Sequence, residues 1–141
     1  MTSEWLYNNQ PFTEIPDGKI CFVYLITNLI LNKKYYGKKR FYFSKTKQVK
    51  GKKKKFKVES DWREYWGSSD DLQKDVLLYG ESKFKREILR LCDLQAESSY
   101  HEAKYQFSDD VLLYPNSFYN NWISVKITRP HLKRLQKIDL E

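Results

Sequence analysis

The chain has 141 residues, of which 40% are hydrophobic and 16% aromatic, and its 26 Lys and Arg against 18 Asp and Glu give a net charge of +8. This length predicts one domain, and the apolar content excludes a chain that is disordered throughout. The longest apolar run covers residues 20–26, whereas a helix that spans a bilayer needs about 20 residues, so we expect no membrane span.

The N-terminal part of the chain shows few signs of regular structure. Its first residues lack the basic-then-apolar order of a signal peptide, which predicts a cytoplasmic protein. Two prolines and a glycine interrupt residues 1–19 without periodicity, so we expect an irregular arm there. Cys21 and Cys92 each lie in an apolar stretch, which favours buried, reduced thiols over a disulfide or a zinc site.

A β-hairpin is predicted next along the chain. Residues 20–26 form a continuous run rich in β-branched and aromatic side chains, the pattern of a strand buried on both faces. Residues 28–32 supply a turn, and residues 33–37 predict the returning strand, which ends at Gly37.

Half of the basic residues gather in one segment, Lys33 to Lys57. It holds 13 of the 26 Lys and Arg residues and no acidic residue, so it carries +13 and the rest of the chain −5. Lysine runs bind phosphates without regard to sequence, and the interspersed Tyr and Phe residues favour nucleic acid over a merely solvated loop. The stretch 44–57 is too hydrophilic for a core and predicts a protruding loop or flap. The expected nucleic-acid contacts here are Lys39, Lys45, Lys47, Lys50, Lys52, Lys53, Lys54, Lys55 and Lys57.

Two helices and a strand follow. Ser60 is an N-cap candidate for a helix over 61–66. Ser69 is a better-marked N-cap, since two acidic residues come directly after it and Gly80 ends the apolar stripe. Residues 88–92 then predict a strand.

The last third of the chain predicts one long helix and a basic tail. Asp93 can cap a helix whose apolar stripe continues to residue 111. Residues 122–128 predict a short strand, and Pro130 predicts a helix over 131–138. This tail is basic; Lys133 and Arg134 are either a second phosphate contact or part of the solvated face of that helix. The element order predicts an α/β or α+β domain built on a small sheet.

Several chemistries find no support in the sequence. There is no nucleophile motif of the GxSxG type, no P-loop and no GxGxxG, so we expect no nucleotide cofactor. The cysteines and histidines lack the short spacings of a zinc site. Any chemistry must therefore come from tyrosine, basic residues and carboxylate.

The hairpin carries a specific motif. Phe22-Val23-Tyr24 precedes Tyr35-Tyr36-Gly37, with eleven positions from the one tyrosine to the other, and this resembles the paired motif of the GIY-YIG nuclease superfamily. The resemblance continues in order through residues 65–69, 79–80, 84–89, 102–105 and 119–120, and it is strongest to the phage Seg-type, free-standing homing endonucleases. It implies an α/β sandwich with a three-stranded mixed or antiparallel sheet over 20–123, a basic insertion at 38–58 and a basic tail at 124–141.

The resemblance also implies a phosphodiesterase that uses one Mg²⁺ or Mn²⁺ ion. In it Tyr24 is the general base or a water-orienting phenol, Tyr35 binds near the phosphate, Glu102 holds the metal and Asn120 supports the site. A phenol has a pKa near about 10, so we expect the basic residues after Gly37 to lower it.

The catalytic arginine of the family has no fixed counterpart, because a basic insertion separates the motif strand from the first helix. Arg40 together with Lys38 is the preferred candidate, since both abut the phenols in sequence, and Arg63 is the second.

Each site residue also has a structural interpretation. Tyr24 lies mid-strand, where tyrosines commonly pack in a core; Glu102 could complete a capping box with Ser99; and Asn120 suits a turn. The function expected from the resemblance is a metal-dependent endonuclease acting on double-stranded DNA, as a monomer or homodimer. The alternatives are a non-catalytic nucleic-acid-binding module and a nuclease for branched or RNA substrates.

Overall fold

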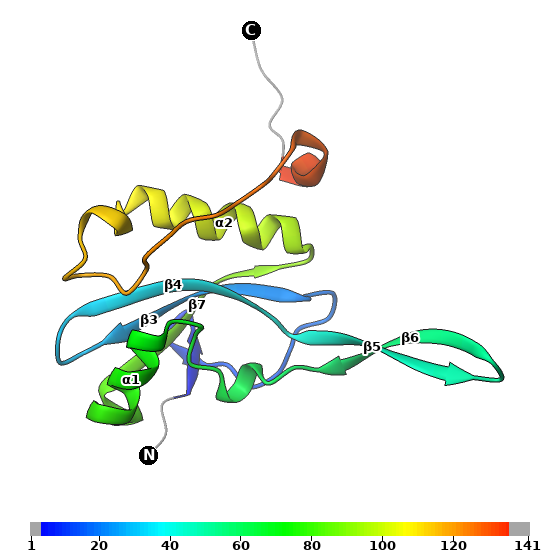
Figure 1. The fold of residues 1–141 in the computed structure, drawn as a ribbon, viewed down its shortest axis with the longest axis horizontal. Helices are drawn as coiled ribbons and strands as arrows, with labels where there is room; N and C mark the ends of the chain where they lie inside the picture. The colour runs from blue at the N-terminus through cyan, green and yellow to red at the C-terminus, as the bar shows by residue number, and fades with distance from the viewer. Residues whose placement is uncertain (1–3, 136–141) are drawn as a thin grey trace, which may run out of the picture.

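The structure is a computed structural model that describes residues 4–135, and its centre is a five-stranded sheet with a helix on either face (Figure 1). The strand order is β2-β1-β7-β3-β4. Strand β3 pairs antiparallel with β4 and β7, and β1 runs parallel to β7. The predicted α/β class is confirmed, and β7-β3-β4 is the predicted three-stranded sheet. The strands are β1 Trp5–Tyr7, β2 Gln10–Pro11, β3 Cys21–Asn28, β4 Lys33–Arg40 and β7 Phe84–Cys92.

The two additional strands come from the segment predicted to be an irregular arm. Asn8 and Asn9 adopt φ angles of 51° and 64°, which asparagine tolerates, and they reverse the chain between β1 and β2. Trp5 packs edge-on against Phe22 with ring centroids 5.1 Å apart, and its indole N–H donates to the Trp62 carbonyl at 2.7 Å. The prediction was wrong for this stretch because a buried tryptophan fixes it to the sheet.

Strand β3 is buried on both faces, as its apolar run predicts. Phe22 and Tyr24 belong to the main core, which also contains residues of the first helix. On the other face Cys21 and Val23 form a smaller cluster with Cys92. Both cysteines are free and buried, as expected.

The two α-helices are α1 Asp70–Tyr79 and α2 Gln95–Ser108. Helix α1 begins and ends where the sequence predicts: Ser69 Oγ accepts a hydrogen bond from the Leu72 amide at 3.2 Å, and Gly80 has a φ of 91°. Asp93 does not cap α2, because its carboxylate forms ion pairs with Lys19 at 2.8 Å and Arg134 at 2.6 Å.

Three further predictions about elements were wrong. The helix expected over 61–66 is a single 3₁₀ turn, η1 Trp62–Glu64. Trp62 is buried there, and the backbone becomes extended at Tyr65 (φ −78°, ψ 131°), which ends the turn. Residues 122–128 form no strand. The terminal helix is a run of 3₁₀ turns, η4 Arg129–Leu135, and its predicted end at 136–138 lies outside the described residues. The other 3₁₀ turns are η2 Glu81–Lys83 and η3 Val111–Leu113.

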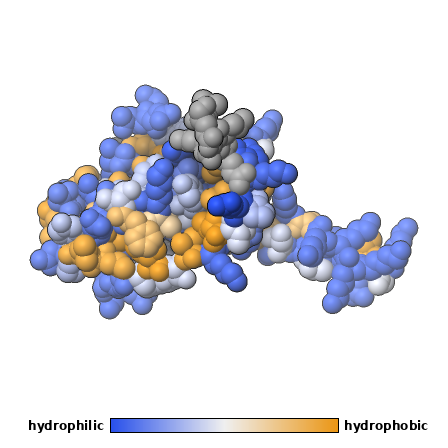
Figure 2. Space-filling model, turned by 90° about the horizontal axis from the view of Figure 1, so that it is seen from above, coloured by the Kyte–Doolittle hydropathy of each residue, from blue (hydrophilic) through white to orange (hydrophobic). Residues whose placement is uncertain are grey.

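The basic segment predicted as a protruding loop or flap does protrude (Figure 1), and it forms a second, two-stranded sheet. Strands β5 Tyr42–Val49 and β6 Lys52–Glu59 pair antiparallel and project from one end of the molecule (Figure 1). Figure 2 shows this hairpin as a mainly hydrophilic arm. Within residues 4–135, no helix has the length and apolar character required to cross a membrane.

Candidate active site

A cavity of about 330 Å³ opens beside β4, the last strand in the sheet order. The segment that follows η3 lies along the edge of β4 at Lys34, whose amide donates to Ser117 O at 2.9 Å and whose carbonyl accepts from the Tyr119 amide at 2.8 Å. The cavity therefore collects residues from both faces of the sheet. Five predicted site residues line it: Tyr24, Tyr35, Lys38, Glu102 and Asn120.

Tyr24 can lie at this wall because its cross-strand neighbour has no side chain. It pairs with Gly37 in the β3–β4 register. A Cβ atom on Gly37 would lie 2.3 Å from Tyr24 Oη, well inside any allowed contact. The glycine of the second motif therefore makes room for the tyrosine of the first.

Tyr35 and Ser68 add two hydroxyl groups to the same wall. The Tyr35 hydroxyl lies 2.9 Å from Ser68 Oγ, and the rings of Tyr24 and Tyr35 have centroids 6.2 Å apart. Hydroxyl groups both donate and accept hydrogen bonds, so this wall can bind neutral or anionic oxygens.

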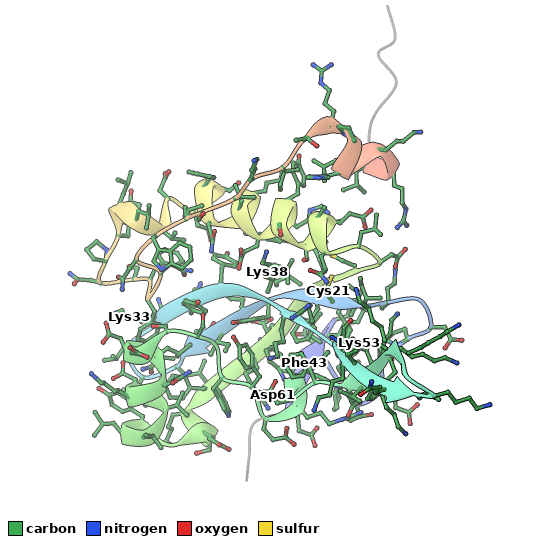
Figure 3. The ribbon with its side chains drawn as sticks, turned by 45° about the vertical axis from the view of Figure 1, so that its right-hand side comes forward. Cys21, Lys33, Lys38, Phe43, Lys53 and Asp61 are labelled. Atoms are coloured by element: carbon green, nitrogen blue, oxygen red, sulfur yellow. The ribbon has the colours of Figure 1, made fainter. Side chains whose placement is uncertain are left out.

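The facing wall comes from α2. Glu102 and Gln106 both line the cavity, as expected for residues four apart on one helix face. Lys38 lies between the sheet and α2, and its Nζ donates to Ser99 Oγ (Figure 3). Burial raises the pKa of the Glu102 carboxyl, and the charge of Lys38 acts in the opposite direction.

This donor set fits a hard divalent cation. Mg²⁺ keeps several of its waters and commonly binds through one or two carboxylates together with substrate phosphates, so Glu102 alone suffices as its charged protein ligand. Residues 4–135 contain no cluster of three His, Cys, Asp or Glu side chains that could hold a metal without help from substrate. The site suits a cation that substrate phosphate helps to bind.

Asn120 acts on the backbone of the motif strand. Its Oδ1 accepts a hydrogen bond from the Tyr36 amide at 3.0 Å, and its Nδ2 donates to the Tyr36 carbonyl at 2.9 Å. The side-chain amide thus continues the pairing that the Ser117–Tyr119 segment begins at Lys34. Asn120 fixes the stretch of β4 between Tyr35 and Gly37.

A family model described as "Putative endonuclease segE, GIY-YIG domain" matches residues 5–123. The chain belongs to the SegE-type GIY-YIG endonucleases. It is therefore a nuclease that acts on phosphodiester bonds, and the resemblance inferred from the paired tyrosine motif is confirmed. The comparisons with curated proteins and with solved structures return no match.

In this GIY-YIG domain the pKa of the Tyr24 phenol is raised rather than lowered. Burial raises the pKa of Tyr24 well above its ordinary value, and Tyr65 and Tyr35 raise it further. Burial also raises the pKa of Tyr35. The expectation of a lowered Tyr24 pKa was wrong, because burial raises it and the neighbouring groups that affect it, Tyr65, Tyr35 and Glu102, raise it further.

The other predicted basic residues lie outside the Tyr24 cavity. Lys39 forms an ion pair with Asp61 at 2.6 Å and sits over the Tyr65 ring. Arg40 lines a neighbouring cavity of about 240 Å³. Arg63 donates to the Thr13 carbonyl and pairs with a carboxylate four residues earlier, on the wall of a third cavity.

The predicted nucleic-acid contacts are divided between the β5–β6 hairpin and the C-terminal segment. Eight of the lysines lie on the β5–β6 hairpin and all eight are exposed. Lys133 is exposed in η4, whereas Arg134 forms ion pairs with Asp93 and with Glu97, at 3.5 Å for the latter.

The cavity also contains residues that sequence reasoning missed. Gln106 could have been found from its position one turn after Glu102. Ser68 lies within a string that matched the family, but no role was assigned to it. Asn121, Trp122 and Ser124 lie in an irregular segment with no local signal, and Trp122 is 72% exposed.

Proposed function

We propose that this chain is a metal-dependent endonuclease that hydrolyses DNA phosphodiester bonds in the cavity beside β4. The observation that carries the proposal is the convergence there of Tyr24 and Tyr35 from the motif hairpin with Glu102 from α2. These residues lie up to 78 positions apart in the sequence, yet they face one space that also receives a lysine.

Glu102 would hold the divalent ion, Mg²⁺ or Mn²⁺, one per site. When bound, the ion supplies Lewis-acid polarisation of the phosphate and stabilises charge on the leaving oxygen. Lys38 is placed to neutralise charge that develops on the non-bridging phosphate oxygens. The Tyr35 and Ser68 hydroxyls would bind one of those oxygens.

The raised pKa of Tyr24 favours one of its two possible roles. A phenol with this pKa is neutral near pH 7, so its oxygen can accept a hydrogen bond from the attacking water but is a poor proton acceptor. We assign to Tyr24 the orientation of that water rather than general-base catalysis.

Lys38 is also the best candidate for the role of the family arginine. It lines the cavity with Tyr24 and Glu102, whereas Arg40 lines the adjoining cavity and Arg63 lines another. Arg40 then serves as a phosphate contact beside the site. A homing-type phage origin, a double-stranded substrate, a cytoplasmic location and a monomeric or homodimeric state stay predictions from the sequence.

The test is cleavage of supercoiled plasmid by the purified protein with Mg²⁺, with Mn²⁺ and with chelator. Tyr24→Phe and Glu102→Gln are each expected to lower the rate by a factor on the order of 10² to 10⁴. Tyr114→Phe, which removes an exposed hydroxyl outside the cavity, is the control and should cut normally.

Two results would contradict the proposal. Cleavage that persists in chelator would exclude a metal-dependent reaction. Binding without cleavage by all four proteins, with either metal, would make the chain a non-catalytic nucleic-acid-binding member of the family.

A further inference from the structure

The β5–β6 hairpin is held at its base and is free elsewhere. Phe41 is fully buried, its amide donates to Ile20 O at 2.9 Å, and its carbonyl accepts from the Ser60 amide at 2.7 Å. Ser60 Oγ donates to the Arg40 carbonyl at 2.6 Å. The base therefore fixes the direction in which the hairpin leaves β4, the strand that carries the motif.

The hairpin carries charge that nothing in the described chain neutralises. Within residues 4–135, no carboxylate forms an ion pair with any of its eight lysines. Lys47 lies directly opposite Lys54 in the register, an arrangement that destabilises a strand pair. An isolated two-stranded hairpin is at best marginally stable, so this repulsion favours a polyanion as the hairpin's partner.

The register separates the side chains into two different faces. Directly opposed residues share a face, and successive residues alternate. We call one the Phe43 face, which combines lysines with apolar side chains, and the other the Tyr42 face, which combines lysines with hydroxyl, amide and acidic groups. The Phe43 face is Phe43, Lys45, Lys47, Val49, Lys52, Lys54, Phe56 and Val58; the Tyr42 face is Tyr42, Ser44, Thr46, Gln48, Lys53, Lys55, Lys57 and Glu59.

Only the Phe43 face is continuous with the active site at the hairpin base. Lys38 lines both the catalytic cavity and the adjoining cavity, and Phe43 lines the adjoining cavity together with Arg40. Tyr42 and Lys57 instead line a cavity on the side of residues 15–20. Figure 3 shows Lys38 between the sheet and α2, and Phe43 near the start of the hairpin.

We infer that the hairpin is a one-sided DNA arm whose Phe43 face grips the phosphate backbone on one flank of the cleaved bond. The inference rests on the proposed function. It adds that the enzyme binds more DNA on one side of the cut than on the other. A basic track then leads from the reacting phosphate outward through Lys38, Arg40, Lys45, Lys47, Lys54 and Lys52.

The length of the arm sets the extent of the contact. Each strand has eight residues, which at about 3.3 Å per residue gives roughly 26 Å. At about 3.4 Å per base step this corresponds to roughly seven or eight base pairs. The enzyme should therefore need several more base pairs on one side of the cut than on the other.

Two matched triple variants test the face. Lys45→Gln/Lys47→Gln/Lys54→Gln removes three charges from the Phe43 face, and Lys53→Gln/Lys55→Gln/Lys57→Gln removes three from the Tyr42 face. Binding to a 30-base-pair DNA duplex is measured between 50 and 300 mM KCl in a Tyr24→Phe background. The first variant should lower the slope of log affinity against log salt by about 2 to 3, since each phosphate contact contributes about 0.9, and the second should change it far less.

A cleavage assay on duplexes shortened from either end measures how many base pairs the enzyme needs on each side of the cut. The unaltered chain should stop cutting when one flank falls below about seven base pairs but tolerate a shorter opposite flank. The Phe43-face variant should lose this asymmetry.

The outcomes separate this inference from the proposed function. If the unaltered chain cuts but the two triple variants have equal salt slopes, the face assignment is overturned and the nuclease stands. The unaltered chain could instead fail to cut any DNA while, of the two triple variants, only the Phe43-face variant shows a reduced salt dependence of binding. In that case the nuclease proposal fails and the DNA arm stands. A larger Phe43-face effect on an RNA duplex than on DNA would overturn the assignment of DNA.

Discussion

Gly37 and Tyr24 pack directly against each other, and the Tyr24 phenol occupies the space that a side chain on Gly37 would need. The space for a Cβ on Gly37 is already filled by the Tyr24 phenol, with Oη at 2.3 Å and Cζ at 2.4 Å. We expect Gly37→Ala to cost about 1–3 kcal/mol of unfolding free energy and to displace the phenol from the cavity, which would lower cleavage.

A double-mutant cycle with urea unfolding checks this. In a Tyr24→Ala background the added methyl group has space, so Gly37→Ala should cost clearly less there than in the unaltered chain. Equal costs in both backgrounds would show that the contact with Tyr24 is not the cause.

Glu102 is expected to trade stability for function. Its pKa is raised in the folded chain, chiefly by burial, so its contribution favours folding below its unfolded pKa and is lost as the pH rises through the folded value. At pH 7 the ionised carboxylate therefore disfavours the folded state. Glu102→Gln should unfold at higher urea concentration than the unaltered chain at pH 7 while losing cleavage.

The pH dependence gives this prediction its sharpest test. The stability advantage of Glu102→Gln should shrink as the pH falls and the native carboxyl becomes protonated. Glu64→Gln, at an exposed carboxyl outside the cavity, should show no such advantage. A Glu102→Gln protein less stable than the unaltered chain at pH 7 would contradict the argument.

At this scale the sequence identified the residues but not their environments. The resemblance to the GIY-YIG family implied that Tyr24, Tyr35 and Glu102 share one site, and all three line the cavity. The direction of the Tyr24 pKa was not predictable, because desolvation depends on which side chains from distant segments cover the ring.

Among the elements, the clamp from Asn120 to β4 should matter most for the site. Asn120→Ala leaves the Tyr36 amide and carbonyl without their partners, which we expect to cost about 1–3 kcal/mol. Hydrogen exchange at the Tyr36 amide should accelerate, and cleavage should fall as β4 loosens. Asn116→Ala, at an exposed position in the same loop, is the control. Unchanged exchange at Tyr36 would rule out the clamp.

Elements with strong local signals were predicted well, and those fixed by distant contacts were not. Strand β3 and helix α1 follow from an apolar run and from a cap at each end. Strand β1 depends on the Trp5 indole reaching Trp62, 57 residues away, and Asp93 is drawn from its capping role by Lys19 and Arg134. Such long-range contacts leave no periodic pattern in the sequence.

At the scale of the whole molecule, the part that stabilises the fold and the part proposed to bind DNA are separate. The sheet and its two helices contain the buried core, whereas the hairpin contributes no fully buried side chain. The sequence predicted the protrusion from its composition, but not the hairpin: its turn is Lys50-Gly51, both with positive φ (50° and 75°), in place of the usual Asn-Gly or Asp-Gly.

This separation predicts that the arm can be shortened without loss of the fold. Deleting residues 44–49 and 52–57 moves the Lys50-Gly51 turn onto the Phe43–Val58 pair. Six residues leave each strand, an even number, so Phe43 and Val58 keep their faces and the base contacts of Phe41 with Ser60 remain. The deletion removes seven lysines and lowers the net charge from +8 to +1.

We expect the deletion to cost under about 1 kcal/mol of unfolding free energy. In a domain of this size such a loss shifts the thermal unfolding midpoint by only a few degrees. The shortened chain should still nick plasmid at low salt, since the catalytic cavity is intact, but lose most activity near 150 mM salt, where the remaining charge no longer holds the DNA. Circular dichroism melts and nicking rates at the two salt concentrations measure both effects. Equal salt sensitivity of the full and shortened chains would place the DNA grip elsewhere on the body, and a shortened chain that fails to fold would show that the hairpin supports the core.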